Sequence, residues 1–439
     1  MLRDRRPPRC DGEVPCGSRV PLRGGRSMSF ELVPRTAPGA IVVAAAESLV
    51  ETFAERAAAA DAENEMCSEN FDDLLTRGIS SAFVPEEIGG VGLESIHDWI
   101  LIIATLARGD ASTAIAITMH HAIGRRMAQM YAVAKTDLGP DHERTKELAE
   151  PLRKMLAGEM LICATATEAG TDNLHPVAEV VPDSDGWRLN GHKIFVTMSP
   201  LATHVSTVVR VRDDDGDHMA NIVLPMDTPG LVPQNDWDAL GMRSSGSQSV
   251  VFKDVLVPES ALGRMGPWGK WSLQYLEFRA IANIVLVGAF LGIAEAAHDI
   301  ALTKLQTRSR VGQLAVEQSG IQNLVGELAL ELAQCRAVLG AAAVQMDEYC
   351  ERHSTSPASM EEAHGLMNDY QIAKWTVNRG AIGVVSKAMD LLGGSGYTNS
   401  DSLARLYRDV RAGPFMQPFG PAELREYVGQ VTLGQYPDN

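Results

Sequence analysis

The sequence lacks an excess of positive charge. Its 39 Lys and Arg residues are outnumbered by 56 Asp and Glu residues, which gives a formal net charge of −17 at pH 7. Nucleic-acid binding depends on clustered Lys and Arg that neutralise phosphates, so no nucleic acid is expected as a partner. The 439 residues, 45% hydrophobic and 22% charged, are typical of a folded chain with two or three domains.

Cysteine is scarce, and no two cysteines form a CxxC pair. The six lie at Cys10, Cys16, Cys67, Cys163, Cys335 and Cys350. Few cysteines in a long chain, without a CxxC pair, fit reduced thiols better than a disulfide framework or a zinc site. We therefore expect reduced thiols, no bound metal and a cytoplasmic protein.

Long uninterrupted hydrophobic runs are also missing. The most apolar stretch, residues 280–297, is short for a membrane span and contains Asn283 and Glu295. It predicts a helix buried in a bundle, in which Gly288 and Gly292 let a neighbour pack closely. Residues 1–27 are rich in Arg, Pro and Gly and lack the apolar core of a secretory signal. We interpret residues 1–39 as a disordered extension, or one that precedes a true start at Met28.

The rest of the chain changes its hydrophobic period twice. Residues 40–162 show apolar spacings of three and four, which predict an N-terminal helical domain. Residues 163–265 alternate with a period of two between turn signals such as DSDG and DDDGD, which predicts an antiparallel β domain. Residues 272–439 return to helical spacing and predict a C-terminal helical bundle. The fold class is therefore α+β with segregated layers.

Several short motifs carry polar groups suited to a flat, charged cofactor. CATATEAGTD (163–172) ends a strand and turns with exposed amides and hydroxyls, and GHKIFVT (191–197) puts an aromatic and a threonine on one strand face. Arg308 ends a helix, and a glycine-rich turn follows at 393–396. The charged run RLYRDVR (405–411) is expected to be a solvated, salt-bridged helix face.

In their order and spacing these motifs resemble the acyl-CoA dehydrogenase family over residues 40–430. The resemblance rests on LLTRGISSAFVPEEIGGVGL (74–93), CATATEAGTD, GHKIFVT, GMRSSGSQSVVFKDVLVP (241–258), RSRVGQLAVEQ (308–318) and LLGGSGYTNSDSLARLYRDVR (391–411). It implies that the C-terminal domain is a four-helix bundle, that FAD is bound between the three domains, and that the protein is a homodimer or homotetramer. It also implies that Ala166, Thr167 and Thr171 lie along the flavin, that Phe195 and Thr197 lie against its ring, and that Arg308 and Gly394 reach the FAD of a neighbouring subunit.

The catalytic base departs from the family pattern. Its usual glutamate lies eight residues beyond the Asp of the RxxRD motif, and counting from Asp409 gives Gln417, within the loop AGPFMQPFGP (412–421). An amide is not a usable base at neutral pH. The alternative position on the first bundle helix is Ala282, so a shifted helix would have to offer Glu277.

The resemblance therefore leaves three functions open. The first is oxidation of an acyl thioester, such as an acyl-CoA, at Cα–Cβ with hydride transfer to flavin N5, in fatty acid metabolism and with an electron-transfer partner. The second is a flavin-dependent monooxygenase of the same fold, for which His120 is a candidate near the flavin. The third is a non-catalytic flavin-binding protein. We expect the first.

Overall fold

The N-terminal block consists of helices packed around α4. The computed structural model describes residues 29–310 and 312–437, so residues 1–28 of the expected extension lie outside the described residues. Thr36 caps the first helix, and its hydroxyl donates to Asp98 Oδ2 of α4 over 2.7 Å. The helical block therefore begins at Ala37. Its helices are α1 (Ala37–Glu47), α2 (Val50–Glu63), α3 (Ser68–Thr76), η1 (Glu86–Ile88), α4 (Ile96–Gly109), α5 (Ala111–Leu138) and α6 (Glu143–Leu156).

The middle block is an eight-stranded sheet. Its central path follows the order β6-β7-β3-β2-β4-β5-β8, with β1 beside β4. The strands are β1 (Ile162–Thr165), β2 (Glu179–Asp183), β3 (Gly186–Val196), β4 (His204–Asp213), β5 (Gly216–Pro225), β6 (Leu231–Pro233), β7 (Gln248–Val257) and β8 (Leu262–Pro267), with short η2 (Arg243–Ser245) and η3 (Glu259–Ala261) between them.

The expectation of a purely antiparallel sheet is wrong. β4 pairs in parallel with β1, from Ile162 opposite His204, and with β2, from Glu179 opposite Arg210. The alternation of apolar and polar residues indicates a strand but does not say which strand lies beside it. The sheet is mixed because the chain passes from β3 over β2 to β4, which pairs in parallel with the far edge of β2.

One consequence of this pairing is a long excursion between β1 and β2. Both strands pair with β4, so the chain leaves the sheet after Thr165 and returns to it at Glu179. We call residues 166–178 the edge loop. Its return is fixed because Arg210 N of β4 donates to Ala178 O over 2.8 Å. The edge loop carries the CATATEAGTD motif from residue 166 onward.

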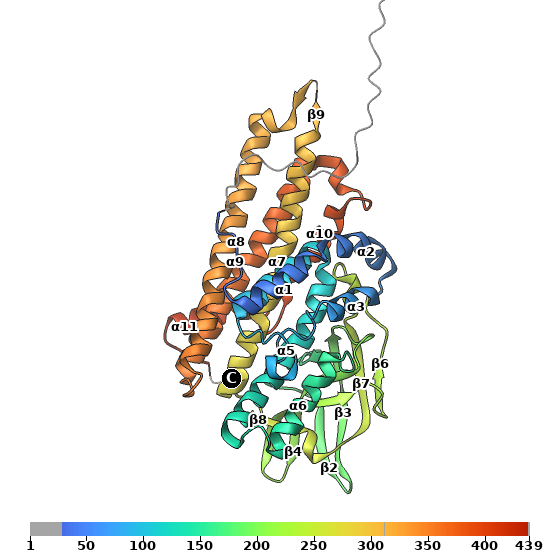
Figure 1. Ribbon diagram of the computed structural model, residues 1–439, viewed down its shortest axis with the longest axis vertical. Coiled ribbons are helices and arrows are strands. Elements are labelled where there is room, and N and C mark those ends of the chain that lie inside the picture. The colour runs from blue at the N-terminus through green and yellow to red at the C-terminus, as the bar shows by residue number, and fades with distance from the viewer. Residues whose placement is uncertain (1–28, 311, 438–439) are drawn as a thin grey trace, which may run out of the picture.

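The C-terminal block is built on three long helices. α7 (Leu273–Thr307), α8 (Ser319–Arg352) and α9 (Met360–Leu392) run side by side, with β9 (Ser309–Arg310) at one end and α11 (Pro421–Thr432) at the other (Figure 1). The remaining elements are β10 (Gln313–Leu314), η4 (Ala315–Glu317), η5 (Gly393–Tyr397), α10 (Ser402–Val410) and η6 (Gly413–Phe415). The fold predicted from the sequence is thereby confirmed apart from the mixed sheet.

Helix α7 joins the bundle to the N-terminal block. A Cβ placed on Gly288 or Gly292 would collide with the backbone oxygens of Ile100 or Ala104 in α4, so both glycines permit a close crossing. By length and composition α7 could span a membrane, but 89% of its most apolar window is buried inside the protein. The bent pair α1–α2 also meets these criteria of length and composition, but only when the two helices are counted as one span. Both findings are weak evidence for a span, since buried core helices meet the same criteria.

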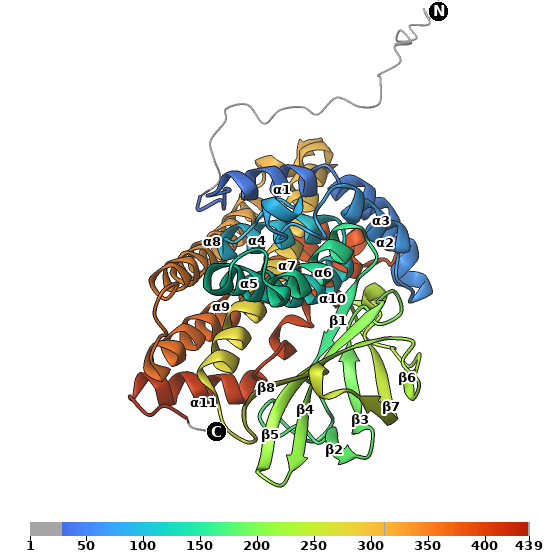
Figure 2. The ribbon, with the colours of Figure 1, turned by 60° about the horizontal axis from the view of Figure 1, so that its bottom comes forward.

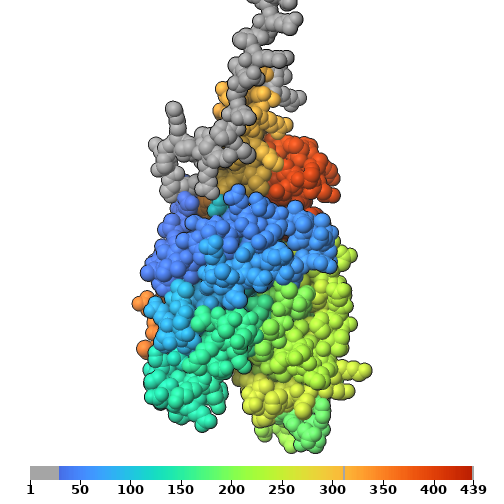
Figure 3. All heavy atoms as spheres, turned by 45° about the vertical axis from the view of Figure 1, so that its right-hand side comes forward, coloured from blue at the N-terminus to red at the C-terminus, as the bar shows by residue number. Residues whose placement is uncertain are grey.

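The three blocks meet around the edge loop. Figure 2 shows the strands on one side of the molecule beneath the N-terminal helices, with α9 and α11 on the other side. Figure 3 shows the N-terminal helices, in blue and cyan, and the strands, in green, adjoining on one face. The site described next lies where the edge loop meets the segment between α10 and α11.

Candidate functional site

A groove lies between the edge loop and residues 412–421, which we call the Gln417 loop. Its volume is about 120 Å³. The lining residues are Ala166, Thr167, Glu168, Thr171, Asp172 and Asn173 from the edge loop, and Phe415, Met416, Gln417, Pro418, Phe419, Gly420 and Glu423 from the other side. The structure therefore brings together three of the predicted flavin contacts and the residue at the usual base position.

The amide of Gln417 is held in one orientation. Arg279 Nη2 of α7 donates to Gln417 Oε1 over 3.1 Å, and Gln417 Nε2 donates to Thr167 Oγ1 over 2.8 Å. Because a guanidinium has only donors, the atom it contacts has to be the amide oxygen. The second N–H of Gln417 has no acceptor among the described residues. The side chain therefore offers a hydrogen-bond donor at the groove.

Arg279 also contacts the edge loop, through Asn173. Its Nη2 donates to Asn173 Oδ1 over 2.9 Å, and Asn173 Nδ2 donates to Pro418 O over 2.8 Å. Tyr275, one turn earlier on α7, donates to Asn173 O over 3.1 Å. These contacts tie α7, the edge loop and the Gln417 loop to one another, so the two walls of the groove cannot move independently.

The backbone of the Gln417 loop is held by three polar side chains of α9. Lys374 Nζ donates to Phe419 O over 2.6 Å and also to Met416 O, and Tyr370 donates to Gln417 O. Asn378 Nδ2 donates to Gly413 O over 2.8 Å. These side chains recur every four residues and share one helix face. They supply donors to loop carbonyls that no helix or strand satisfies.

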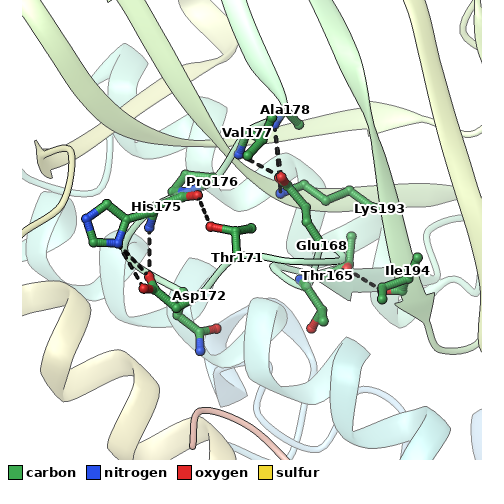
Figure 4. Close-up of polar contacts among 12 residues, drawn as sticks. Thr165, Glu168, Thr171, Asp172, His175, Pro176, Val177, Ala178, Lys193 and Ile194 are labelled. Atoms are coloured by element: carbon green, nitrogen blue, oxygen red, sulfur yellow. Dashed lines mark hydrogen bonds and ion pairs between the residues drawn. The ribbon is translucent and has the colours of Figure 1, made fainter.

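Glu168 is buried in the edge loop and is part of its framework. Its carboxylate pairs with Lys193 of β3, a fully buried side chain, and accepts from Val177 N over 2.6 Å and Ala178 N over 3.0 Å (Figure 4). Burial lowers the pKa of Lys193, and the Glu168 charge opposes that shift. Both groups are committed to each other and to the loop backbone, which closes the edge loop onto the sheet.

Thr171 and Asp172 shape the tip of the edge loop. Thr171 Oγ1 donates to His175 O over 2.5 Å, while Asp172 Oδ1 accepts from Leu174 N over 2.7 Å and lies 2.9 Å from His175 Nδ1 (Figure 4). The tip is therefore a self-contained turn. The hydroxyl proton of Thr171 is used inside the loop, which leaves its oxygen as an acceptor.

Phe195 lies near the end of β3 and is exposed, at 54%, with its ring edge-on to Trp237 at 5.9 Å between centroids. Its φ is +54°, a conformation that is costly for a bulky residue, and its neighbour Ile194 N donates to Thr167 O over 3.0 Å. Thr197 Oγ1 lies 2.9 Å from Ser247 Oγ. Phe195 therefore presents an exposed ring, whereas Thr197 is buried, and their contact with a flavin stays a prediction.

Comparison with known proteins places this architecture in a family. Models of the N-terminal, middle and C-terminal domains of acyl-CoA dehydrogenases match residues 40–136, 162–255 and 280–426. The chain belongs to the acyl-CoA dehydrogenase family. The resemblance drawn from the six sequence motifs is thereby confirmed.

Within the acyl-CoA dehydrogenase family the chain is similar to enzymes named for amino sugars. It is 34% identical to amino sugar nitrososynthase DnmZ of Streptomyces peucetius over 83% of this chain and 86% of that one. It is 35% identical to amino sugar nitrososynthase RubN8 of Streptomyces rubradiris over 92% of each. The solved complex of KijD3 with FMN and dTDP-3-amino-2,3,6-trideoxy-4-keto-3-methyl-D-glucose is 31% identical, with a TM-score of 0.85 over 94% of this chain and 98% of that one.

Two residues that the acyl-CoA dehydrogenase pattern assigns to a neighbouring subunit lie far from the groove. Arg308 Nη1 donates to Leu391 O over 3.1 Å and Leu392 O over 3.0 Å, which brings it beside Gly394 in η5. Arg279 and Arg308 are 29 positions apart, and nearly all of that span is α7, so about 40 Å of helix separates them. This separation is what a contact with a second subunit requires, and that contact stays a prediction.

The alternative base Glu277 does not face the groove. It accepts a 2.7 Å hydrogen bond from the hydroxyl of Tyr349 in α8. Arg279, two residues later, does reach Gln417, and residues two apart on an α-helix point about 200° apart. The geometry therefore brings Gln417 and Thr167 together and leaves Glu277 on the opposite side of α7.

His120 lies in the packing between α5 and β1. Its Nδ1 accepts from Ile162 N over 3.2 Å, and the ring also bonds the Ser80 backbone. Burial lowers its pKa to about 3, and that of His121 to about 4. Both rings are neutral at physiological pH and have partners within the protein, so neither is presented to the groove.

This burial makes a prediction about acid stability. Below pH 6.5 the unfolded chain protonates His120, whereas the folded chain does so only near pH 3, so the free energy of unfolding falls as the pH falls through this window. Between pH 6.5 and 5 this difference lowers the free energy of unfolding of the wild type by roughly 2 kcal/mol. His120→Asn, whose amide oxygen can replace Nδ1 as acceptor, should lack this decrease when unfolding in urea is measured at the two pH values. His142→Asn, at the exposed N-cap of α6, is the control. An unchanged pH dependence in His120→Asn would contradict the burial.

The expectation of a solvated charged face for residues 405–411 is wrong for two residues. Arg405 and Asp409 of α10 are buried and lie 3.8 Å apart, and Asp409 Oδ1 accepts from Met242 N over 2.6 Å. Burial raises the pKa of Asp409 to about 6. These residues hold the segment that leads into β7 rather than facing solvent. Arg408 does form an ion pair nearer the surface, with Asp61.

Proposed function

We propose that this protein is a flavin-dependent monooxygenase that oxidises the amine nitrogen of an amino sugar carried on a nucleotide. The observation that carries the proposal is the oriented amide of Gln417, which offers an N–H at the place where the family usually presents a carboxylate. The coarser activity, a flavin oxidoreductase of the acyl-CoA dehydrogenase fold, rests on the family itself.

Position 417, where the family usually presents its carboxylate base, holds an amide. The three acids that line the groove each have a partner within the protein. Glu168 pairs with Lys193, Asp172 caps the edge-loop turn, and Glu423 Oε2 accepts from Gly420 N over 2.7 Å. Abstraction of an α-proton from an acyl thioester needs such a base, whereas a neutral amine brings its own lone pair to an electrophilic oxygen. This favours oxygen transfer over acyl-thioester oxidation.

The residues around the groove fit a flavin. Phe195 would support one face of the ring, and Ala166, Thr167 and Thr197 would contact its polar edge, in line with the sequence-based assignment. A bound flavin, reduced by an external donor, would supply two electrons, so that one atom of O₂ enters the amine and the other leaves as water. KijD3 was solved with FMN, whereas the sequence resemblance implied FAD, and we propose FMN for this protein.

The chain's own residues would bind and orient the substrate. Gln417 would donate its free N–H to an oxygen of the sugar, and Arg279 would keep the amide from turning over. The Tyr370, Lys374 and Asn378 side chains would hold the loop backbone in place. Preorganised donors of this kind do not have to reorganise during the reaction, which is why they are effective.

The proposal is tested with the purified full chain, a flavin reductase, NADH, O₂ and dTDP-3-amino-2,3,6-trideoxy-4-keto-3-methyl-D-glucose. We expect the amine to be consumed and a product one oxygen atom heavier to form, followed by its oxidation to the nitroso compound. Mass spectrometry with ¹⁸O₂ measures the incorporation. The flavin released by heating the protein is identified by chromatography, with FMN expected.

A panel of acyl-CoA thioesters serves as the opposing assay. Under anaerobic conditions none should bleach the oxidised flavin, because the position of the usual carboxylate base is occupied by the amide of Gln417. Bleaching by one of them, together with an amino sugar that stays unchanged, would replace the proposed function with acyl-thioester oxidation.

A further inference from the structure

Arg279 is a buried cation that has no carboxylate partner among residues 29–310 and 312–437. It is 8% exposed, and its Nε is buried without a hydrogen-bond partner. Only Nη2 is used, toward the neutral amides of Gln417 and Asn173. No residue in the described part of the chain accepts a hydrogen bond from Arg279 Nη1. A guanidinium has five N–H donors in a planar fork, and most of them are left here without an acceptor.

The surroundings of Arg279 add positive charge rather than cancel it. Lys374 is also buried and also lacks an ion-pair partner in the described part of the chain, since its Nζ contacts only backbone oxygens. Burial lowers the pKa of Lys374 to about 7, Glu423 opposes this shift, and the charge of Arg279 adds to it. The phenols of Tyr275 and Tyr370 add no charge. The acids that line the groove, Glu168, Asp172 and Glu423, form no ion pair with Arg279 in the described part of the chain.

An unpaired buried charge is costly, and proteins normally pair it or place it where a ligand supplies the counter-charge. Arg279 lies directly behind Gln417 and Asn173, both of which line the groove. The negative charge that Arg279 lacks within the described chain is therefore expected from whatever occupies the groove. The uncompensated positive charge is a local feature of this site, because the chain as a whole has a net charge of −17.

We propose that Arg279 is the anion-binding residue of the groove, and that the anion is a phosphate group of a nucleoside-diphosphate substrate. The proposal rests on the function proposed above, because it assigns the charged part of that substrate to a residue of the chain. A guanidinium fork matches phosphate geometry, and Nη1 is the unused donor that the phosphate would fill, since Nε is fully buried. The sugar amine would lie beyond the phosphate, toward Gln417 and the exposed ring of Phe195. Arg279 then selects nucleotide-bound over free amino sugars.

Binding to the full chain tests this without any turnover. Isothermal titration compares dTDP with thymidine, which lacks the phosphates, for wild type, Arg279→Met and Arg279→Lys. We expect Arg279→Met to weaken dTDP binding by at least about tenfold and to leave thymidine binding nearly unchanged, with Arg279→Lys in between. Arg379→Met, which removes an exposed arginine stacked on Trp375 of α9, is the control and should behave as wild type. Circular dichroism and size exclusion establish that each variant folds.

A parallel titration with FMN and riboflavin tests whether Arg279 instead binds the phosphate of the flavin cofactor. If Arg279→Met weakens FMN but not riboflavin binding and leaves dTDP unaffected, the residue serves the cofactor, and the proposal is overturned. An equal loss for dTDP and thymidine would also overturn it. If dTDP binding depends on Arg279 but no amino sugar is oxidised, the proposed function fails while the anion site stands. If the amino sugar is oxidised but Arg279→Met binds dTDP as tightly as wild type, the anion site fails while the proposed function stands.

Discussion

Replacement of Glu168 by alanine is expected to destabilise the protein by about 3–5 kcal/mol, because it leaves the fully buried Lys193 without its counter-ion. The same change removes the acceptor for two backbone amides, Val177 N and Ala178 N, where the edge loop rejoins the sheet. Urea unfolding followed by tryptophan fluorescence measures the loss at pH 7.

The double variant Glu168→Gln with Lys193→Met distinguishes the buried charge from the lost packing. Glutamine keeps an oxygen for the two amides, and methionine keeps an unbranched apolar chain, so both charges disappear together. The double variant should lose less than half of what Glu168→Ala loses. Asp183→Ala breaks an exposed pair with Arg188 on the same sheet and should not move the unfolding midpoint measurably. A double variant as unstable as the single one would show that charge burial is not the cause.

Gln417→Glu is expected to lower kcat/KM for the amino sugar by about 100-fold without creating an acyl-CoA dehydrogenase. The substitution replaces a donor by a carboxylate that can only accept. The new carboxylate would lie within reach of Arg279, whose Nη2 is 3.1 Å from Gln417 Oε1, and an ion pair there lowers a carboxyl pKa. A base with a lowered pKa is ineffective for removing the weakly acidic α-proton of a thioester. Steady-state kinetics and anaerobic titration with acyl-CoA measure the two effects.

Gln430→Glu provides the matched control, because it makes the same change of charge on α11 away from the groove. It should retain wild-type kinetics. The double variant Gln417→Glu with Arg279→Met removes the ion pair and should return the carboxyl pKa toward its usual range. If Gln417→Glu alone allows an acyl-CoA to bleach the flavin, then Arg279 does not control this position, and the anion site proposed for it loses its main support.

Much of the fold follows from local features of the sequence. The change of period near residues 163 and 265 corresponds to β1 at Ile162 and α7 at Leu273, because period is a property of neighbouring residues. Gly288 and Gly292 predicted a close helix crossing, and α4 makes it. Counting from Asp409 gave Gln417, which does lie in the groove, since the intervening residues form one short connection.

The partners of these residues were not predictable, because they come from distant parts of the chain. Arg279 lies 138 positions from Gln417 and 106 from Asn173, so no spacing connects them. The parallel pairing of β4 is also a long-range property. One signal was available: Tyr370, Lys374 and Asn378 repeat every four residues on the buried face of α9. Such a polar stripe indicates that carbonyls nearby have to be satisfied.

The way the edge loop is attached bears on how this site could change in evolution. Its two ends are fixed independently, since β1 and β2 each pair with β4, and the register of one does not depend on the other. Residues can therefore be added or removed between Ala166 and Val177 while the sheet stays as it is. A change in the length of the edge loop would therefore alter the size of the groove, and with it the substrates that fit, without altering the sheet.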